Sequence, residues 1–221
     1  MFPKKGKTMQ PDVIEKLFTG PDGQYRFARW GRPIAPVIFG TDNDSLDVLK
    51  YAMQDVATLA DMKLAETDPE LGANFIVFFC QDWDELLGVP NLEKMLPDLP
   101  EKVAELKARG ANQYRTFAFD EDGAIKMCTL VIRYDAEMAS VSAQTLMTGQ
   151  MAQSLLVWAP DAFAQTSPVG IITENNYAIV RPDIAALIRA AYDVTMPAAA
   201  DDQTHALRLA ARIGLLLGDG L

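Results

Sequence analysis

A continuous apolar run extends from Asn74 to Cys80 and limits the folds that this chain can adopt. The run has the length of a β-strand, and it lacks the polar alternation of a strand that has one face in water. It therefore predicts a central strand covered on both faces. A chain of 221 residues is long enough to bury the layers that such a strand needs.

The clearest local signal is a β-hairpin around Asp122-Gly123. Two segments of strand character, 114–119 and 124–134, flank this turn, and Asp-Gly supplies the positive backbone φ that tight turns require. Residues 25–30 and 33–40 also have strand character, but Pro36 restricts the second of these strands to an edge or a bulge.

Helical periodicity and capping residues account for most of the remaining chain. They predict helices at 11–18, 43–62, 141–158, 182–192 and 203–217, and short pieces broken by proline between 82 and 109. We expect that broken stretch to be an insertion over one sheet edge. The order of elements predicts one α+β domain over residues 24–218, preceded by a flexible leader with a short helix over residues 1–23. No Gly-rich phosphate loop follows a strand, which disfavours a doubly wound nucleotide-binding sheet.

The charge balance argues against two classes of partner. The formal net charge is −10 and the pI is near 4.6, so the mean field repels polyanions and nucleic acid is not expected as a partner. No window approaches the roughly 20 apolar residues that a bilayer crossing needs, so membrane insertion is not expected either. The lysines near the start are not followed by an apolar segment, so the sequence as given shows no signal peptide.

The chain has a single histidine, His205, on which both a zinc site and a catalytic triad would depend. Zinc catalysis generally uses three protein ligands, and an HExxH pair is impossible with one histidine. We therefore expect no bound zinc and no cofactor. A Ser-His-Asp or Cys-His arrangement would also need His205, which lies among apolar helix residues and is expected to be an ordinary packed side chain.

Cys80 and Cys128 both fall in predicted strands that could be neighbours. Two readings follow from this placement. The thiols could form a disulfide, above all if the protein is exported, or they could remain two buried thiols. The distance between the two Cα atoms decides between them.

The stretch from Gly170 to Ala178 concentrates polar groups between two predicted helices. Glu174, Asn175, Asn176 and Tyr177 are candidate ligand-binding residues, because polar loops on a rigid scaffold are frequent binding sites. The alternative is a turn in which the two asparagines bond to nearby backbone groups.

Short segments spread over residues 25–213 carry a resemblance to a known family. They are Arg29-Trp30 with Pro33-Ile34, Ala73-Asn74-Phe75-Ile76-Val77, Asp122-Gly123 with Thr129-Leu130-Val131-Ile132, Gln153-Ser154-Leu155, Ile172-Thr173-Glu174-Asn175, and Ala191-Tyr192-Asp193 with Met196. In this order they resemble an uncharacterised family of exported proteobacterial proteins with a zincin-like, metallopeptidase-like fold. The resemblance implies a mixed β-sheet with a β-hairpin, a helical C-terminal part and a periplasmic or extracytoplasmic location.

The resemblance also places a site on the helix that matches a metallopeptidase HExxH helix. Its five positions would be Gly149 to Gln153, so neither metal-binding histidine is present, and the amide of Gln150 stands where the general-base glutamate would be. This chain also departs from the family in having Leu156-Val157-Trp158 after that segment. We expect Gln150 and Gln153 to point toward the 174–177 loop, across a remnant cleft.

Three hypotheses about function follow. The leading one is a non-catalytic binding or interaction domain of the bacterial cell envelope, in which Gln150, Gln153 and the 174–177 loop bind an unknown protein or small polar ligand. The second is a metal-independent hydrolase that uses carboxylates, with Glu174 as a base. The third is a structural homo-oligomer held together by exposed Met and aromatic residues.

Overall fold

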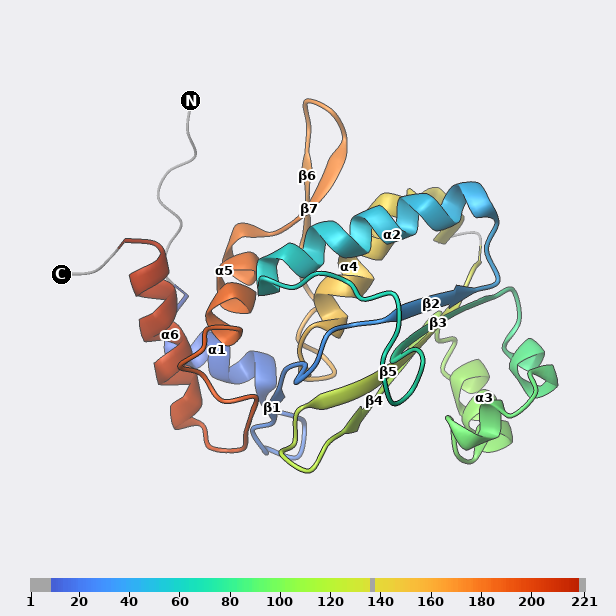
Figure 1. Ribbon diagram of the computed structural model, residues 1–221, viewed down its shortest axis with the longest axis horizontal. Helices are drawn as coiled ribbons and strands as arrows, with labels where there is room; N and C mark the ends of the chain where they lie inside the picture. Colours follow the sequence, from blue (N-terminus) through green and yellow to red (C-terminus); the bar gives the residue numbers. More distant parts are fainter. Residues whose placement is uncertain (1–8, 136–137, 219–221) are drawn as a thin grey trace.

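The computed structural model describes residues 9–135 and 138–218, and its centre is a four-stranded mixed sheet (Figure 1). The strand order is β2-β3-β5-β4. The first three strands are parallel, and β4 runs antiparallel to β5 at the edge. The bounds of these strands are β2 (Pro36–Phe39), β3 (Phe75–Cys80), β4 (Gln113–Phe119) and β5 (Ile125–Arg133). The predicted α+β class is confirmed.

The apolar run forms the central strand β3, as predicted, because both of its faces are covered. Phe75 and Val77 are fully buried in the main core, whereas Cys80 packs into a second apolar cluster on the opposite face. The β4–β5 hairpin is also confirmed, with Gly123 at a φ of +78° in its turn. Pro36 starts β2, which is the other edge strand, as the proline required.

Two helices pack against each other over the main-core face of the sheet, and Asp42 and Ser142 cap their N-termini through side-chain hydrogen bonds (Figure 1). They are α2 (Asn43–Ala57), continued by the 3-10 turn η1 (Thr58–Ala60), and α4 (Ala143–Ser154), preceded by η4 (Met138–Ser140). The helix expected to reach residue 158 ends at Ser154, because Leu156 leaves the helix to form a β-bridge with Arg29.

The insertion covers the second face of the sheet, not only an edge. Its apolar side chains, Trp83 and Leu106 among them, pack with Cys80 and Val131 into the second cluster. The elements of the insertion are η2 (Trp83–Gly88), η3 (Leu92–Lys94) and α3 (Leu99–Ala108).

The two ends of the described chain come together beside the sheet (Figure 1). Residues 27–28 pair with residues 199–200, and Ile14 and Phe18 are fully buried in the main core. The boundary expected after residue 23 therefore does not separate this helix from the domain, and residues 1–8 lie outside the described part. The elements are α1 (Pro11–Phe18), β1 (Phe27–Ala28), α5 (Pro182–Ala191), β8 (Ala199–Ala200) and α6 (Thr204–Leu216).

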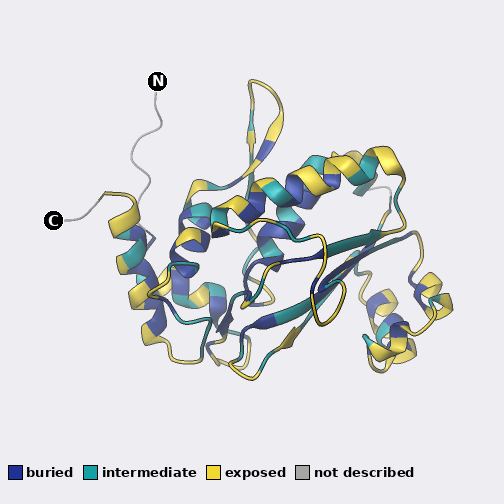
Figure 2. Ribbon diagram, viewed as in Figure 1, coloured by how far each residue is buried: buried dark blue, intermediate teal, exposed yellow. Residues whose placement is uncertain are grey.

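The predicted polar loop is a two-stranded hairpin, β6 (Val169–Ile172) and β7 (Tyr177–Val180). Its turn projects from the body of the protein and is exposed, whereas the inner sides of α2 and α4 are buried (Figures 1 and 2). No helix in the described ranges is long and apolar enough to span a membrane.

The structure contradicts the possible disulfide between Cys80 and Cys128. β3 and β5 are adjacent, but their register pairs Cys128 with Phe75, five positions before Cys80. At about 3.3 Å per residue, the two cysteines are roughly 16 Å apart along the strands, whereas a disulfide needs Cα atoms within about 7 Å. Both cysteines are free and buried, and their side chains belong to different apolar clusters.

Candidate functional site

The segment Gly149 to Gln153 lies inside α4, as predicted, but Gln150 does not point toward the 174–177 turn. Its side chain is buried, and its Nε2 donates to Oε1 of Gln113 at 2.7 Å, while its Oε1 accepts from Arg115. Both partners belong to the edge strand β4. The predicted direction of Gln150 is therefore wrong, because the amide faces the sheet.

Arg115 is the charged centre of this polar network. Its Nε donates to the Ser154 hydroxyl at 3.0 Å, and its guanidinium also bonds to the side chain of Gln150. Within the described ranges it forms no ion pair with a carboxylate, and burial lowers the pKa of Arg115 below its usual value. Gln150 and Ser154 thus solvate a cation between α4 and β4, which is a structural role for the amide.

Gln153 is half-buried and stays on its own helix, since its Nε2 donates to the Gly149 carbonyl at 3.2 Å. A Cβ at Gly149 would lie 3.3 Å from the Cγ2 atom of Val169, so β6 packs closely against this part of α4. Gly149 thus packs against β6, and the Gln153 amide is bonded within its own helix.

The remaining predicted residues gather at the exposed β6–β7 turn. Asn175 Oδ1 accepts from the Tyr177 backbone N–H at 3.2 Å, and Asn176 adopts a φ of +53°, which fits a turn that satisfies its own backbone. The Tyr177 hydroxyl donates to Asp55 of α2 at 2.6 Å, and Glu174 accepts from the adjacent Thr173 hydroxyl at 3.4 Å. The structure thus separates these four residues from Gln150 and its partners.

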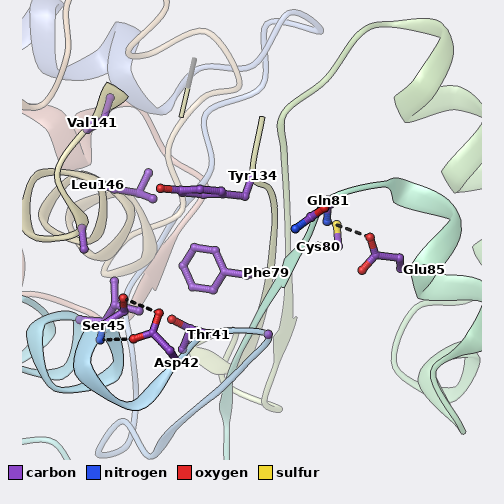
Figure 3. A pocket seen from close by; sticks show the side chains of 13 residues that line it. Thr41, Asp42, Ser45, Phe79, Cys80, Gln81, Glu85, Tyr134, Val141 and Leu146 are labelled. Carbon is purple, nitrogen blue, oxygen red and sulfur yellow. Dashed lines mark hydrogen bonds between the residues drawn. The ribbon is translucent and has the colours of Figure 1, made fainter. Parts of the chain in front are cut away.

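A different place, at the carboxyl ends of the three parallel strands, contains a cavity of about 460 Å³ (Figure 3). We call it the strand-end pocket. It lies between the ends of β2, β3 and β5 and the N-terminal turns of α2 and α4. Its lining residues are Gly40, Thr41, Asp42, Ser45, Leu49, Phe79, Cys80, Gln81, Glu85, Tyr134, Val141, Ala143 and Leu146.

Gly40 makes the close approach of β2 and β3 possible at the pocket. Its φ is +79°, and a Cβ there would lie 2.1 Å from the carbonyl oxygen of Phe79. Only glycine fits this position without moving the backbone. The chain can then turn directly from the end of β2 into the cap of α2, which places Thr41, Asp42 and Ser45 at the pocket wall (Figure 3).

The lining of the pocket includes two carboxylates, which lie at separate places (Figure 3). Asp42 accepts from the Ser45 backbone N–H at 2.7 Å, and this bond holds the pKa of the Asp42 carboxyl below its usual value. Glu85 accepts from the backbone N–H groups of Gln81 and Asp82 at 3.0 and 2.9 Å. Both carboxylates are exposed, so each keeps accepting capacity for a further donor.

The apolar side is aromatic and aliphatic. Phe79 and Tyr134, from the ends of β3 and β5, direct their rings toward the same space, and Leu146 of α4 faces Tyr134 (Figure 3). Tyr134 is 45% exposed although it is a large aromatic side chain. An apolar lining with a few polar groups is the usual composition of a small-molecule site.

Cys80 also lines the pocket, but its environment does not favour a nucleophile. Burial raises the pKa of its thiol to about 11, with a further contribution from the negative charges of Glu85 and Asp82. Near neutral pH the reactive thiolate is therefore scarce. Cys80 therefore forms part of the pocket wall and is not an activated nucleophile.

Sequence reasoning missed the strand-end pocket. A usable signal was present, because Thr41-Asp42 and Gln81 to Glu85 place polar residues directly after two strands. Ligands of open sheets with parallel strands collect at the carboxyl ends of those strands. The rule can be applied only when β2, β3 and β5 are known to be parallel neighbours, and the sequence alone does not show this.

The described residues contain no group of three or more His, Cys, Asp or Glu side chains arranged to hold a metal ion. Comparisons of the chain with protein-family models, with curated proteins and with solved structures found no match.

Proposed function

We propose that this protein is a non-catalytic binding domain that takes a small ligand in the strand-end pocket. The single observation that carries the proposal is the position and lining of this cavity. It combines about 460 Å³ of space, an aromatic wall and exposed hydrogen-bonding groups at the carboxyl ends of three parallel strands.

The resemblance to the zincin-like family supports this proposal at the level of the scaffold. The mixed sheet, the β4–β5 hairpin and a following helix that contains residues 149–153 agree with what that resemblance implies. We propose the zincin-like assignment and the cell-envelope location on that ground. The site within the scaffold differs from the expected one, because Gln150 is engaged by Gln113 and Arg115.

The hydrolase hypothesis has less support. Glu174 lies at an exposed turn, where its described partner is the adjacent Thr173 hydroxyl. A general base needs a positioned partner beside a space for substrate, and Glu174 does not line the strand-end pocket.

The self-association hypothesis rests on exposed apolar side chains. Exposed aromatic side chains are present, as that hypothesis expected, among them Phe39, Tyr51 and Phe119. Leucines of α6 and its cap are exposed as well, namely Leu207, Leu215, Leu216 and Leu217. A dimer through α6 is compatible with a ligand in the pocket, since the two places are at opposite ends of the protein (Figure 1).

The experiment that tests the binding proposal is a fragment screen followed by amide chemical-shift mapping on the full chain. The expected result is a set of fragments whose shifts centre on residues 40–45 and 79–81. Tyr134→Ala should weaken these fragments at least about fivefold, because it removes half of the aromatic wall. Tyr51→Ala is the matched control, since Tyr51 is 75% exposed and lies outside the pocket lining. Shifts that map elsewhere, or no shifts at the solubility limit of the fragments, would refute the proposal.

A further inference from the structure

We propose that the strand-end pocket selects a small organic cation, a molecule with an ammonium group on an aromatic or aliphatic body. This inference rests on the proposed function, because it names the ligand class of the same pocket. It is carried by three features of the pocket: the charge of its lining, its aromatic faces and the side-chain caps on the two helix N-termini beside it.

The charge of the lining is negative. Asp42 and Glu85 contribute carboxylates, and none of the described residues that line the cavity is Lys, Arg or His. The cations beside the pocket are engaged elsewhere, because Arg133 pairs with Asp135 at 3.1 Å and Lys107 pairs with Asp84 at 2.6 Å. The lining thus offers an ammonium group one carboxylate at each of two separate places, Asp42 and Glu85 (Figure 3).

Aromatic rings provide the second feature. Phe79 is half-buried and Tyr134 is 45% exposed, and both rings are directed into the pocket (Figure 3). The face of an aromatic ring carries negative charge and attracts a cation, and the same ring also packs against an apolar body. Phe79 and Tyr134 therefore suit both parts of an amphipathic amine.

Two helix N-termini face the pocket, and on their own they would favour an anion. At each terminus a side-chain cap of the protein itself occupies one backbone donor. At α2, Asp42 accepts from the backbone N–H and the hydroxyl of Ser45 at 2.7 and 3.0 Å. At α4, the Ser142 hydroxyl oxygen accepts from the Thr145 backbone N–H at 3.1 Å. Because the cap of α2 is a carboxylate, the N-terminus of this helix already carries a negative charge and does not favour a second anion.

The test uses three probes of similar size, 2-phenylethylamine, 2-phenylethanol and phenylacetate, titrated into the full chain at neutral pH. Binding is followed by the amide shifts of residues 40–45 and 79–81. We expect the amine to bind about three- to tenfold more tightly than the alcohol, because it adds charge attraction and a cation–π contact. Phenylacetate should bind more weakly than the alcohol. Added salt should reduce the advantage of the amine.

Two substitutions remove the charges and keep the caps. Asp42→Asn retains a good N-cap acceptor, and Glu85→Gln retains the reciprocal bond of a capping box. The double variant should bind amine and alcohol with nearly equal affinity. Asp202→Asn is the matched control, because Asp202 also accepts from a helix N-terminus, that of α6, at 2.8 Å from Thr204, and lies outside the pocket. It should leave the preference unchanged.

The outcomes separate this inference from the proposed function. If amine and alcohol bind the wild-type pocket equally, or phenylacetate binds most tightly, the cation inference is overturned while binding in the pocket stands. The same holds if the double variant keeps the preference for the amine. If none of the probes shifts the pocket residues and the fragment screen finds no other ligand there, both proposals fail.

Discussion

The hydroxyl of Tyr25 lies 2.8 Å from Nδ1 of His205, and this buried hydrogen bond joins the N-terminal part of the chain to α6. The imidazole is 2% exposed, and the Phe27 ring packs against it with 4.3 Å between the ring centroids. Nε2 of His205 has no hydrogen-bond partner among the described residues. The single histidine is thus a packed core residue, as its apolar helix neighbours predicted.

Stability should fall between pH 7.5 and pH 5 because of His205. Burial, with a smaller effect of the Arg208 charge, lowers the pKa of His205 from 6.5 to about 4. The unfolded chain therefore takes up a proton near pH 6.5, whereas the folded protein does so only near pH 4. The resulting loss is about 2 kcal/mol at pH 5. Urea unfolding of the wild type and of His205→Gln at both pH values measures it. The wild type should lose about 2 kcal/mol more than the variant, and equal losses would contradict this assignment.

Replacing Tyr25 by Phe should destabilise the fold by about 1 to 3 kcal/mol, because it leaves a buried imidazole without its partner. Tyr51→Phe is the control, since Tyr51 is 75% exposed and its change should stay within about 0.5 kcal/mol. Thermal and urea unfolding report both variants. A Tyr25→Phe protein as stable as the control would show that the hydrogen bond contributes little.

The amide of Gln150 should contribute to stability through Arg115. Gln150→Leu removes an acceptor from a buried cation and is expected to cost about 1 to 3 kcal/mol. Adding Arg115→Met removes the cation as well, so the double variant should recover most of that loss. Urea unfolding of the wild type, the two single variants and the double variant gives the coupling free energy between the two side chains. Additive losses would mean that the two side chains do not act as a pair.

Both thiols should remain free after purification in air. Cys80 and Cys128 are too far apart along their strands to bridge, and burial raises the pKa of their thiols to about 11 and about 12. A thiol reagent should react slowly with the native protein and modify both cysteines once urea unfolds it. Mass spectrometry of the unfolded, alkylated protein gives the count. A protein two mass units lighter and resistant to alkylation would indicate a disulfide.

Elements with local signals could be predicted from the amino-acid sequence. The apolar run of 74–80 became β3 because its composition suits a covered strand, and Asp122-Gly123 set the hairpin because Gly123 can adopt a positive φ. The helix predicted around residues 149–153 also formed, although its buried residues, Thr148, Gln150 and Ala152 among them, surround the helix and do not make one apolar face.

Contacts between residues far apart in the chain could not be predicted in this way, because they depend on how the elements pack. Helical spacing does not tell whether Gln150 faces the 174–177 turn or Arg115 on β4, because that depends on how α4 lies against the sheet. Strand composition does not set the register that places Cys128 beside Phe75 rather than beside Cys80. The strand-end pocket exists because the order β2-β3-β5 brings three carboxyl ends together, and these contacts join segments far apart in the chain.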